Sequence, residues 1–280
     1  MTGTNVGITV VGEDRAGVVT AFTGFVFGHG GNIEKINQDV KNGLFGMYLE
    51  ASFPGTINMD AFGTEIQEIA REYKMEVSTR HEAGPNRNVA VFVTRESHCL
   101  KAILDARDEL RGRIAVVVGT EGTLSKMAED AGVPFVEVAE KNQEEAEQRL
   151  ISTCKKYDID LIVLARYMRI LNPNFVWRYP DRIMNIHPSL LPAFTGASAY
   201  AQAFERGTKI VGVTAHYVTE NLDQGPIIFQ DSFKVGPADG IEEIKKKGQE
   251  LEARTLLKAV RMHLEGKLEV RWRRVHVKEQ

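Results

Sequence analysis

Short runs of apolar residues alternate with stretches of helical periodicity over the middle of this 280-residue chain. Such alternation is typical of strand–helix–strand units, in which each helix crosses over to a parallel strand. The runs are apolar almost throughout, as expected for strands that helices cover on both faces. We therefore predict a mostly parallel, Rossmann-like α/β sheet. The predicted strands are Val89–Val93, Ile114–Val118, Phe135–Val138 and Leu161–Leu164, and the predicted helices lie near Leu100–Leu110, Leu124–Ala131 and Glu144–Tyr157.

The last third of the chain continues with apolar runs that predict further strands. Ile241–Leu264 has apolar residues at helical spacing and predicts one long helix. Leu268–Val277 alternates apolar and polar residues, which predicts a late edge strand. Its basic run Arg271–Arg274 is typical of charges that protect a sheet edge, and it suggests nucleic-acid binding only weakly. The further strands are predicted at Ile183–His187, Ile210–Val218 and Pro226–Val235.

The first 82 residues have a different order of elements, which predicts a separate domain. They read strand, helix, strand, strand, helix, strand, the βαββαβ order of a ferredoxin-like sandwich. Asn42-Gly43 is typical of a hairpin turn within it. A Gly-Pro pair without apolar periodicity makes 83–88 the predicted linker, so we expect domains at 1–82 and 89–280. The predicted elements of the first domain are Val6–Val11, Gly17–Phe27, Asn32–Val40, Leu44–Phe53, Met59–Tyr73 and Met75–Thr79.

Composition argues against several classes of function. The 35 basic and 38 acidic side chains leave a net charge of −3, unlike the basic surface of a nucleic-acid-binding protein. Cys99 and Cys154 are too few for a disulfide framework, so we expect a reducing, cytoplasmic compartment. No apolar run has the length of a membrane helix, and the first residues lack the pattern of a signal peptide. No group of His, Asp or Glu residues has metal-ligand spacing, so we expect no metal.

Polar residues follow the apolar strands where a parallel sheet binds its ligands, at the carboxyl ends of the strands. Asn185 and His187 end one predicted strand and point to the same face, about 6.5 Å apart. Pro188 then stops the strand. A second polar turn, Thr219–Pro226, offers a carboxylate that pairs with His187 or holds a water. An amide donor, an imidazole and a carboxylate suffice for acyl chemistry without a serine or cysteine nucleophile.

Three blocks of this sequence resemble those of the folate-dependent formyltransferases, in the order and spacing of that family. They are Leu161–Leu171 (LIVLARYMRIL), Asn185–Phe194 (NIHPSLLPAF) followed by Gly196, and His216–Gln230 (HYVTENLDQGPIIFQ). The resemblance implies that Asn185, His187 and Asp223 are catalytic. It also implies that the folate and its formyl group contact Met168, Arg169, Ile170, Leu171, Gly196, His216, Val218 and Thr219. For three of these residues a purely structural role stays open: Arg169 as a solvated surface arginine, Gly196 as an ordinary loop glycine and His216 as a core histidine.

The N-terminal domain resembles an ACT domain. The resemblance rests on Asp14–Gly17 after the first strand and on His29–Ile33 after the first helix. It implies that a small amino-acid effector binds at an interface between paired domains, and hence that the protein is a homo-oligomer. A purely structural pairing domain is the alternative. The residues that match the effector loop are Gly30, Gly31, Asn32 and Ile33.

An ACT domain ahead of a formyltransferase domain is similar to the formyltetrahydrofolate deformylase family. The resemblance implies hydrolysis of 10-formyltetrahydrofolate, as substrate rather than cofactor, to tetrahydrofolate and formate for purine biosynthesis. The alternative is a phosphoribosylglycinamide formyltransferase, which shares the three catalytic residues. The loop Thr94–Leu100 has no glycine to cradle an acceptor's phosphate, and this favours the hydrolase. His187-Pro188, and a Gly196–Tyr200 segment without proline, favour the transferase. A third hypothesis is a folate sensor without catalysis.

Overall fold

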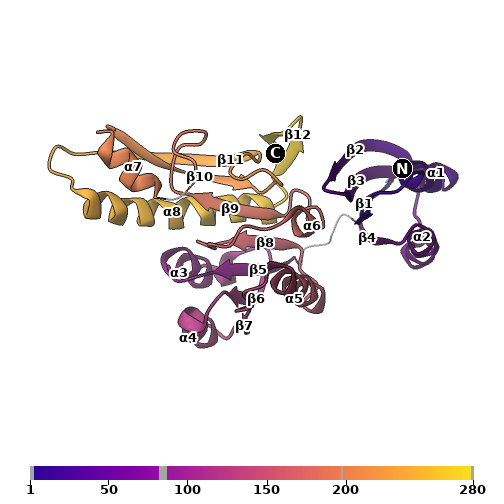
Figure 1. Cartoon of the computed structure of the whole chain (residues 1–280), viewed down its shortest axis with the longest axis horizontal. Helices are drawn as coiled ribbons and strands as arrows, with labels where there is room; N and C mark the ends of the chain where they lie inside the picture. The colour runs from indigo at the N-terminus through magenta and orange to yellow at the C-terminus, as the bar shows by residue number, and fades with distance from the viewer. Residues whose placement is uncertain (1–2, 82–86, 197, 279–280) are drawn as a thin grey trace. The chain divides into compact units, whose positions relative to one another are not determined.

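The computed structural model describes residues 3–81, 87–196 and 198–278, which form two compact units (Figure 1). The first unit holds the described residues up to His81 together with the distant segment Asn172–Pro180. The second unit holds the other described residues. Most of the predicted linker, 83–88, lies outside the described residues, and Asn88 already begins the first strand of the second unit.

The first unit is a four-stranded antiparallel sheet with two long helices in the order βαββαβ. The sheet order is β2-β3-β1-β4, so the edge strand β2 pairs only with β3 among the described strands. Asn42 and Gly43 both have positive φ angles, 54° and 77°, which the predicted hairpin turn between these strands requires. The elements are β1 (Thr4–Glu13), α1 (Val18–Gly28), β2 (Asn32–Lys41), β3 (Leu44–Phe53), α2 (Met59–Tyr73) and β4 (Met75–His81), with the short helix α6 (Pro173–Val176) joining them.

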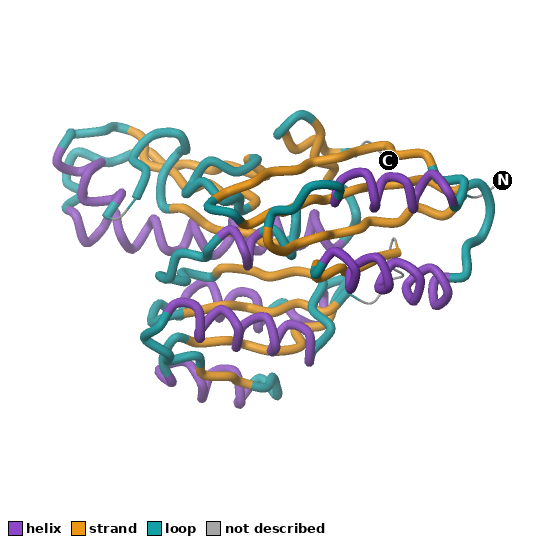
Figure 2. The backbone as a smooth tube through the Cα atoms, turned by 45° about the vertical axis from the view of Figure 1, so that its right-hand side comes forward, coloured by secondary structure: helices purple, strands orange, loops and turns teal. Residues whose placement is uncertain are grey.

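The second unit is built on a seven-stranded sheet of the order β11-β10-β9-β8-β5-β6-β7, drawn in orange in Figure 2. The five strands from β9 to β7 are parallel, and β10 and β11 are antiparallel. The predicted mostly parallel α/β sheet is confirmed. The elements are β5 (Asn88–Val93), α3 (His98–Asp105), β6 (Arg113–Gly119), α4 (Ser125–Asp130), β7 (Phe135–Glu137), α5 (Gln143–Lys156), β8 (Leu161–Leu164), β9 (Ile183–His187), α7 (Ala199–Glu205), β10 (Ile210–Tyr217), β11 (Ile227–Lys234) and α8 (Ile241–Leu264).

Helices cover the sheet and explain why its central strands are apolar. The long helix α8 lies along β9, β10 and β11 and packs against α3 (Figure 1). Both helices share one core with β5 and β8, which includes Leu100, Val163 and Leu256. The right-handed crossover from β7 back to β8 places α5 on the opposite face. Among the described residues no helix, α8 included, is long and apolar enough to cross a membrane.

The strand order changes direction between β5 and β8. From β5 the chain moves outward through β6 to β7, and it then returns to place β8 on the other side of β5. Loops that leave two neighbouring strands in opposite directions open a crevice at their carboxyl ends, which is where open α/β sheets bind ligands. The residues after β5 and β8 lie at this reversal of strand order, and β9 is the next strand beyond β8.

The C-terminal segment corrects one prediction. The single edge strand predicted over Leu268–Val277 is instead a hairpin of β12 (Leu268–Arg271) and β13 (Arg274–Val277), which form a separate two-stranded sheet. Trp272 and Arg273 make the turn with φ angles of 52° and 60°. Glycine, asparagine and aspartate adopt such angles most readily, so a Trp-Arg turn gives no turn signal in the sequence.

Candidate active site

Asn185 and His216 face each other across two neighbouring strands. Antiparallel pairing of β9 with β10 sets His216 opposite Asn185 and Thr214 opposite His187. The Asn185 amide nitrogen lies 3.2 Å from His216 Nε2. A β-bulge between Ala215 and His216 interrupts the pairing with β11 at this point, and bulges commonly re-aim a side chain beside a functional site. The sequence predicts an amide and an imidazole close together on one strand, Asn185 and His187. The structure also places the Asn185 amide beside the imidazole of His216, on the neighbouring strand.

His216 is the acceptor in this pair. Its ring is buried, and its Nδ1 lies 2.8 Å from the carbonyl oxygen of Tyr217. A carbonyl only accepts, so Nδ1 carries the proton, and Nε2 then accepts from the Asn185 amide. Burial lowers the pKa of His216, more than its backbone hydrogen bond and the nearby Asp223 raise it. The neutral ring holds the Asn185 amide in one orientation.

His187 lies between two oxygen acceptors. Its Nδ1 is 3.4 Å from Oδ2 of Asp223, and its Nε2 is 3.0 Å from the carbonyl oxygen of Phe194. A neutral imidazole has only one N–H, so the ring can donate to both acceptors only when it is doubly protonated. Burial disfavours the charged ring, but the hydrogen bonds to Asp223 and Phe194 outweigh burial and raise the pKa of His187. The two acceptors therefore favour the doubly protonated ring.

Asp223 reaches His187 from the loop that follows β10. Its backbone is left-handed, with a φ of 55°, and the loop closes where Tyr217 N donates to the carbonyl oxygen of Pro226 at 2.9 Å. The Asp223 side chain is 6% exposed, and its Oδ2 also accepts from Gly196 N at 3.2 Å. Burial raises its pKa, but the hydrogen bond and charge of His187 and the Gly196 amide lower it overall. These contacts therefore favour the ionised carboxylate.

The structure brings Asn185, His187, His216, Asp223 and Gly196 together. Gly196 has a φ of 80°, a conformation that favours glycine, and its contact with Asp223 is through the backbone. The structure therefore fits both interpretations of Gly196, as a residue of the candidate site and as an ordinary loop glycine.

The residues expected to hold the folate ring lie at the ends of β8 and β10. Met168 and Ile170 are apolar residues that are 61% and 65% exposed, and Leu171 is buried. Arg169 donates to the carbonyl oxygen of Glu140 at 2.7 Å, so it is not a solvated surface arginine. Val218 N donates to Ile183 O at 2.8 Å, and Thr219 Oγ1 donates to Asn221 O at 3.2 Å. None of these described contacts joins the group around His187.

The four residues expected to bind an effector lie in the first unit, where α1 turns into β2. Gly30 has a φ of 72°. A Cβ on Gly31 would lie 2.5 Å from the ring of Phe53, so the chain packs too closely there for a side chain. Asn32 donates to the carboxylate of Glu34, and Ile33 packs on the core of this unit.

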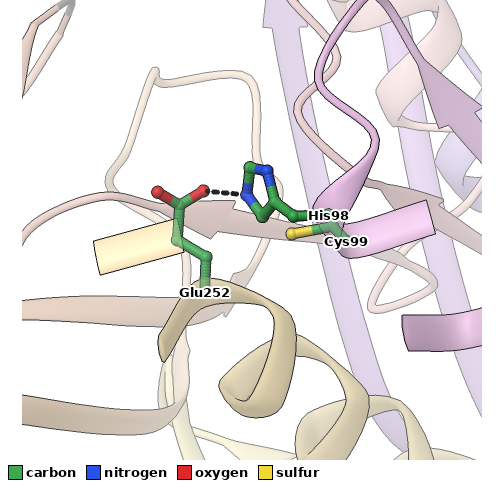
Figure 3. A group of neighbouring side chains, drawn as sticks. All are labelled: His98, Cys99 and Glu252. Atoms are coloured by element: carbon green, nitrogen blue, oxygen red, sulfur yellow. Dashed lines mark hydrogen bonds and ion pairs between the residues drawn. The ribbon is translucent and has the colours of Figure 1, made fainter. Parts of the chain in front are cut away.

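A second polar cluster, which the sequence reasoning missed, lies where the chain leaves β5 and β8. We name it the charge ring: Glu96, His98, Arg166 and Glu252. Figure 3 shows the His98 ring pointing at the fully buried carboxylate of Glu252 on α8. His98 begins α3, and its side chain is only 17% exposed. A signal existed for Glu252, because it lies at helical spacing with the buried residues Gly248 and Thr255.

Ligand atoms of His98, Cys99 and Glu252 lie within 4.8 Å of one another, a spacing at which a metal ion could bind. The donor chemistry argues against that use. Burial, and then the charge of Glu252, raise the pKa of the Cys99 thiol well above its usual value, whereas metals bind the thiolate. The Glu252 carboxylate already accepts from Tyr200 and lies 3.4 Å from the Arg166 guanidinium. The group is held together by its own ion pairs and hydrogen bonds.

Comparison with known proteins gives the family of this chain. The sequence model of the formyl transferase family matches residues 87–260. A formyltetrahydrofolate deformylase of Bacillus subtilis strain 168 is 38% identical over 263 residues, which cover 91% of this chain and 87% of that protein. The crystal structure of a formyltetrahydrofolate deformylase from Pseudomonas syringae pv. tomato matches with a TM-score of 0.68 at 34% identity, covering 100% of this chain and 96% of the other. The structure of glycinamide ribonucleotide transformylase 1 from Symbiobacterium toebii matches with a TM-score of 0.67 at 35% identity, but covers only 70% of this chain and 96% of its own. Similarity along nearly the whole length places this chain in the formyltetrahydrofolate deformylase family.

Proposed function

We propose that this protein hydrolyses 10-formyltetrahydrofolate to tetrahydrofolate and formate. The observation that carries the proposal is the placement of His187 3.4 Å from the Asp223 carboxylate, beside an Asn185 amide that His216 orients. These groups supply the oxyanion donor, the acid and the water-binding base that acyl hydrolysis needs. Family membership along the whole chain supports the same reaction. The formate supplies purine biosynthesis, and the reaction balances the folate pool.

The proposed roles follow from the hydrogen-bond partners of each side chain. One hydrogen of the Asn185 amide is held by His216, and its second hydrogen is the donor we assign to the formyl oxygen. The formyl oxygen takes the place of the Phe194 carbonyl as acceptor of the His187 Nε2 proton. Asp223 holds a water and takes its proton as the oxygen attacks the formyl carbon. The bond from that carbon to the folate nitrogen breaks, His187 protonates the nitrogen, and the proton on Asp223 restores the imidazolium.

The folate ring is proposed to lie against the loop that follows β8. Met168 and Ile170 present exposed apolar side chains there, which can cover a planar ring. Val218 and Thr219 follow β10 and form the opposite wall. Arg169 braces the loop through Glu140 rather than contacting the folate through its guanidinium.

Water, rather than an amine, is the proposed acceptor of the formyl group. The loop Thr94–Leu100 contains no glycine that would let backbone N–H groups approach a phosphate, and Glu96 adds a negative charge. The transformylase of Symbiobacterium toebii covers only 70% of this chain. His187-Pro188 remains the feature that favours the transferase, and the experiment below tests it.

The test is formate release from 10-formyltetrahydrofolate with and without glycinamide ribonucleotide, in wild type and in Asp223→Asn. Release without the amine, lost in the variant, is the expected result. Release only with the amine would replace the proposal with the transferase. Folate binding without turnover, unchanged by His187→Ala, would identify a sensor.

We further propose that the first unit is an ACT-like domain that pairs with a second copy and binds a small amino acid at Gly30–Ile33. Its element order and the sheet order β2-β3-β1-β4 support this. The packing of Gly31 against Phe53 fits a purely structural pairing domain equally well. Sedimentation with and without a panel of amino acids separates the two: an effector changes assembly or melting temperature in wild type and not in Asn32→Ala. No response to any amino acid, in an oligomeric protein, would leave only the pairing role.

A further inference from the structure

Tyr217 lies between the two parts of the candidate active site. Its carbonyl oxygen is 2.8 Å from Nδ1 of His216, the ring that orients the Asn185 amide. Its backbone N–H donates to the carbonyl oxygen of Pro226 at 2.9 Å and closes the loop that carries Asp223. The position of this one residue therefore affects both the amide and the carboxylate of the site.

The sheet alone holds Tyr217 less firmly than the residues within β10, because the strand ends here. The pairing with β9 runs only as far as Tyr217, and the pairing with β11 ends one residue earlier, at His216. The Asp223 loop passes directly against this strand end, since a Cβ on Gly225 would lie 1.7 Å from the Tyr217 carbonyl oxygen. A shift of Tyr217 would therefore also move the loop.

The side chain of Tyr217 supplies a further anchor. Its hydroxyl lies 2.7 Å from Nδ1 of His263 on α8, and the two rings meet edge to face with their centroids 5.8 Å apart. The two residues are 2% and 8% exposed. Burial raises the pKa of Tyr217, so the hydroxyl keeps its proton and donates it to Nδ1 of His263 in a hydrogen bond. This bond joins the end of β10 to a helix of the core.

His263 is itself held in place near the end of α8. Its carbonyl oxygen accepts from Arg87 Nη1 at 3.0 Å. Its neighbours on the helix, Val260 and Leu264, belong to the same apolar core as Tyr217. A polar ring on the buried side of a helix costs free energy unless it is hydrogen-bonded, and an apolar residue would fill this position without that cost. The bond between His263 and Tyr217 is therefore a specific contact that the core is built around.

We propose that Tyr217 is a positioning residue for hydrolysis, held in place by its hydrogen bond to His263. This inference rests on the proposed hydrolase function. With the bond made, the Tyr217 carbonyl oxygen keeps the proton of His216 on Nδ1, so that Nε2 accepts from Asn185. The same strand end sets where the loop presents Asp223. A misplacement of about 1 Å can cost about 10²-fold in rate, so turnover depends on an anchor that touches neither the substrate nor the reacting atoms.

The experiment compares Tyr217→Phe, His263→Leu and the double variant with wild type. Formate release gives kcat and KM, and the nitrogen NMR resonances of the imidazoles report which nitrogen of His216 carries the proton. We expect each single variant to lower kcat at least tenfold and to change KM less than threefold, because Met168 and Ile170 follow another strand, β8. The double variant should lose no more than either single variant, since both changes remove one hydrogen bond. In all three variants we expect the proton of His216 to leave Nδ1 in part of the molecules.

Two further variants separate positioning from stability. His263→Asn is the conservative change, because its amide oxygen can accept from the Tyr217 hydroxyl, and kcat should recover to within threefold of wild type. Tyr200→Phe is the matched control. It removes the hydroxyl of another buried tyrosine, which donates to Glu252 of the charge ring on the same helix at 2.6 Å but lies on α7 and not on a strand of the site. It should lower the melting temperature and leave kcat and the His216 proton as in wild type.

Equal losses of kcat in Tyr217→Phe and Tyr200→Phe would mean general destabilisation and would overturn the inference. So would a kcat or a His216 tautomer in Tyr217→Phe that matches wild type, or losses that add in the double variant. Tyr217→Phe alone carries the test if His263→Leu fails to fold. If wild type releases no formate, the proposed hydrolase function fails, and the His216 resonances still decide whether the bond to His263 positions the ring.

Discussion

Replacing Asp223 with asparagine tests the charge pairing at the centre of the proposed chemistry. The two side chains are each 6% exposed, and His187 Nδ1 lies 3.4 Å from Asp223 Oδ2. At this distance the attraction between unit charges is about 1 kcal/mol in bulk water and about 5 kcal/mol at an effective dielectric constant of about 20. An opposite charge this close shifts a pKa by about 1–3 units. We expect the pKa of His187 to fall by that amount in Asp223→Asn.

The assay combines an NMR titration of the histidine ring protons with formate release measured over pH. In the proposed mechanism His187 acts as an imidazolium, so we expect the wild-type rate to fall as pH rises through the raised pKa of His187. In Asp223→Asn the same fall occurs at lower pH. The maximal rate drops by about 10²–10⁴-fold, the typical contribution of a positioned acid or base. Glu220→Gln, the same chemical change three residues earlier, is the control, because Glu220 accepts only from Asn221 among its described partners.

Two results would refute this reasoning. If His187 titrates at the same pH in Asp223→Asn as in wild type, the carboxylate does not hold the proton on the ring. If the pKa falls but formate release persists within a few fold, the pairing exists and the reaction does not depend on it.

Three further predictions concern pH, a glycine and the core. His187 has a raised pKa, so its pairing with Asp223 adds to the free energy of unfolding below about pH 6.5, and this stabilisation is lost as pH rises through the raised pKa. Asp223 has a lowered pKa, so its stabilisation is present above about pH 3.8 and is lost as pH falls through the lowered pKa. The free energy of unfolding of Asp223→Asn, measured in urea from pH 3 to 9, is therefore furthest below wild type between those limits, and a constant difference would contradict the assignment. Gly225→Ala places a Cβ 1.7 Å from the Tyr217 carbonyl oxygen, so it should move the Asp223 loop and cut formate release at least tenfold. Gly24→Ala is the control, because a Cβ there has no atom within 4 Å, and it should stabilise α1 by about 0.5–1 kcal/mol in thermal melts. Leu150→Ala removes a fully buried side chain from α5 and should cost about 2–5 kcal/mol in urea unfolding, against under about 1 kcal/mol for the half-exposed Arg149→Ala; equal losses would mean that α5 does not pack as described.

The strands of the second unit were predictable because burial on both faces leaves a continuous apolar run. Val89–Val93 and Leu161–Leu164 read as strands from composition alone. The active-site group was predictable in part, since Asn185 and His187 end a strand that Pro188 stops. The pairing of His187 with Asp223 came from the family resemblance, because a loop with a left-handed residue brings them together over 36 positions of sequence.

Other features have no local signal. Glu252 is a charged residue in a long helix, a position that is normally exposed, and only the approach of Tyr200 and Arg166 from other elements makes its burial favourable. The turn at Trp272 uses residues that rarely adopt positive φ angles. Tertiary contacts decide these cases, and they join residues far apart in the chain.

The segment Asn172–Pro180 belongs to the first unit but lies within the sequence of the second, so one cut in the chain cannot separate the two units. The chain crosses between the units once between His81 and Arg87, again after Leu171, and a third time after Pro180. Trp177 fills the space above Gly46, and Arg178 forms two hydrogen bonds to Glu76, at 2.8 and 2.9 Å, inside the first unit. A cut between His81 and Arg87 alone would therefore not yield two intact modules: the C-terminal fragment would still carry Trp177 and Arg178, between β8 and β9, without the residues that they contact in the first unit. Excision, domain swapping or fusion to another partner would have to transplant this nine-residue stretch together with the N-terminal unit.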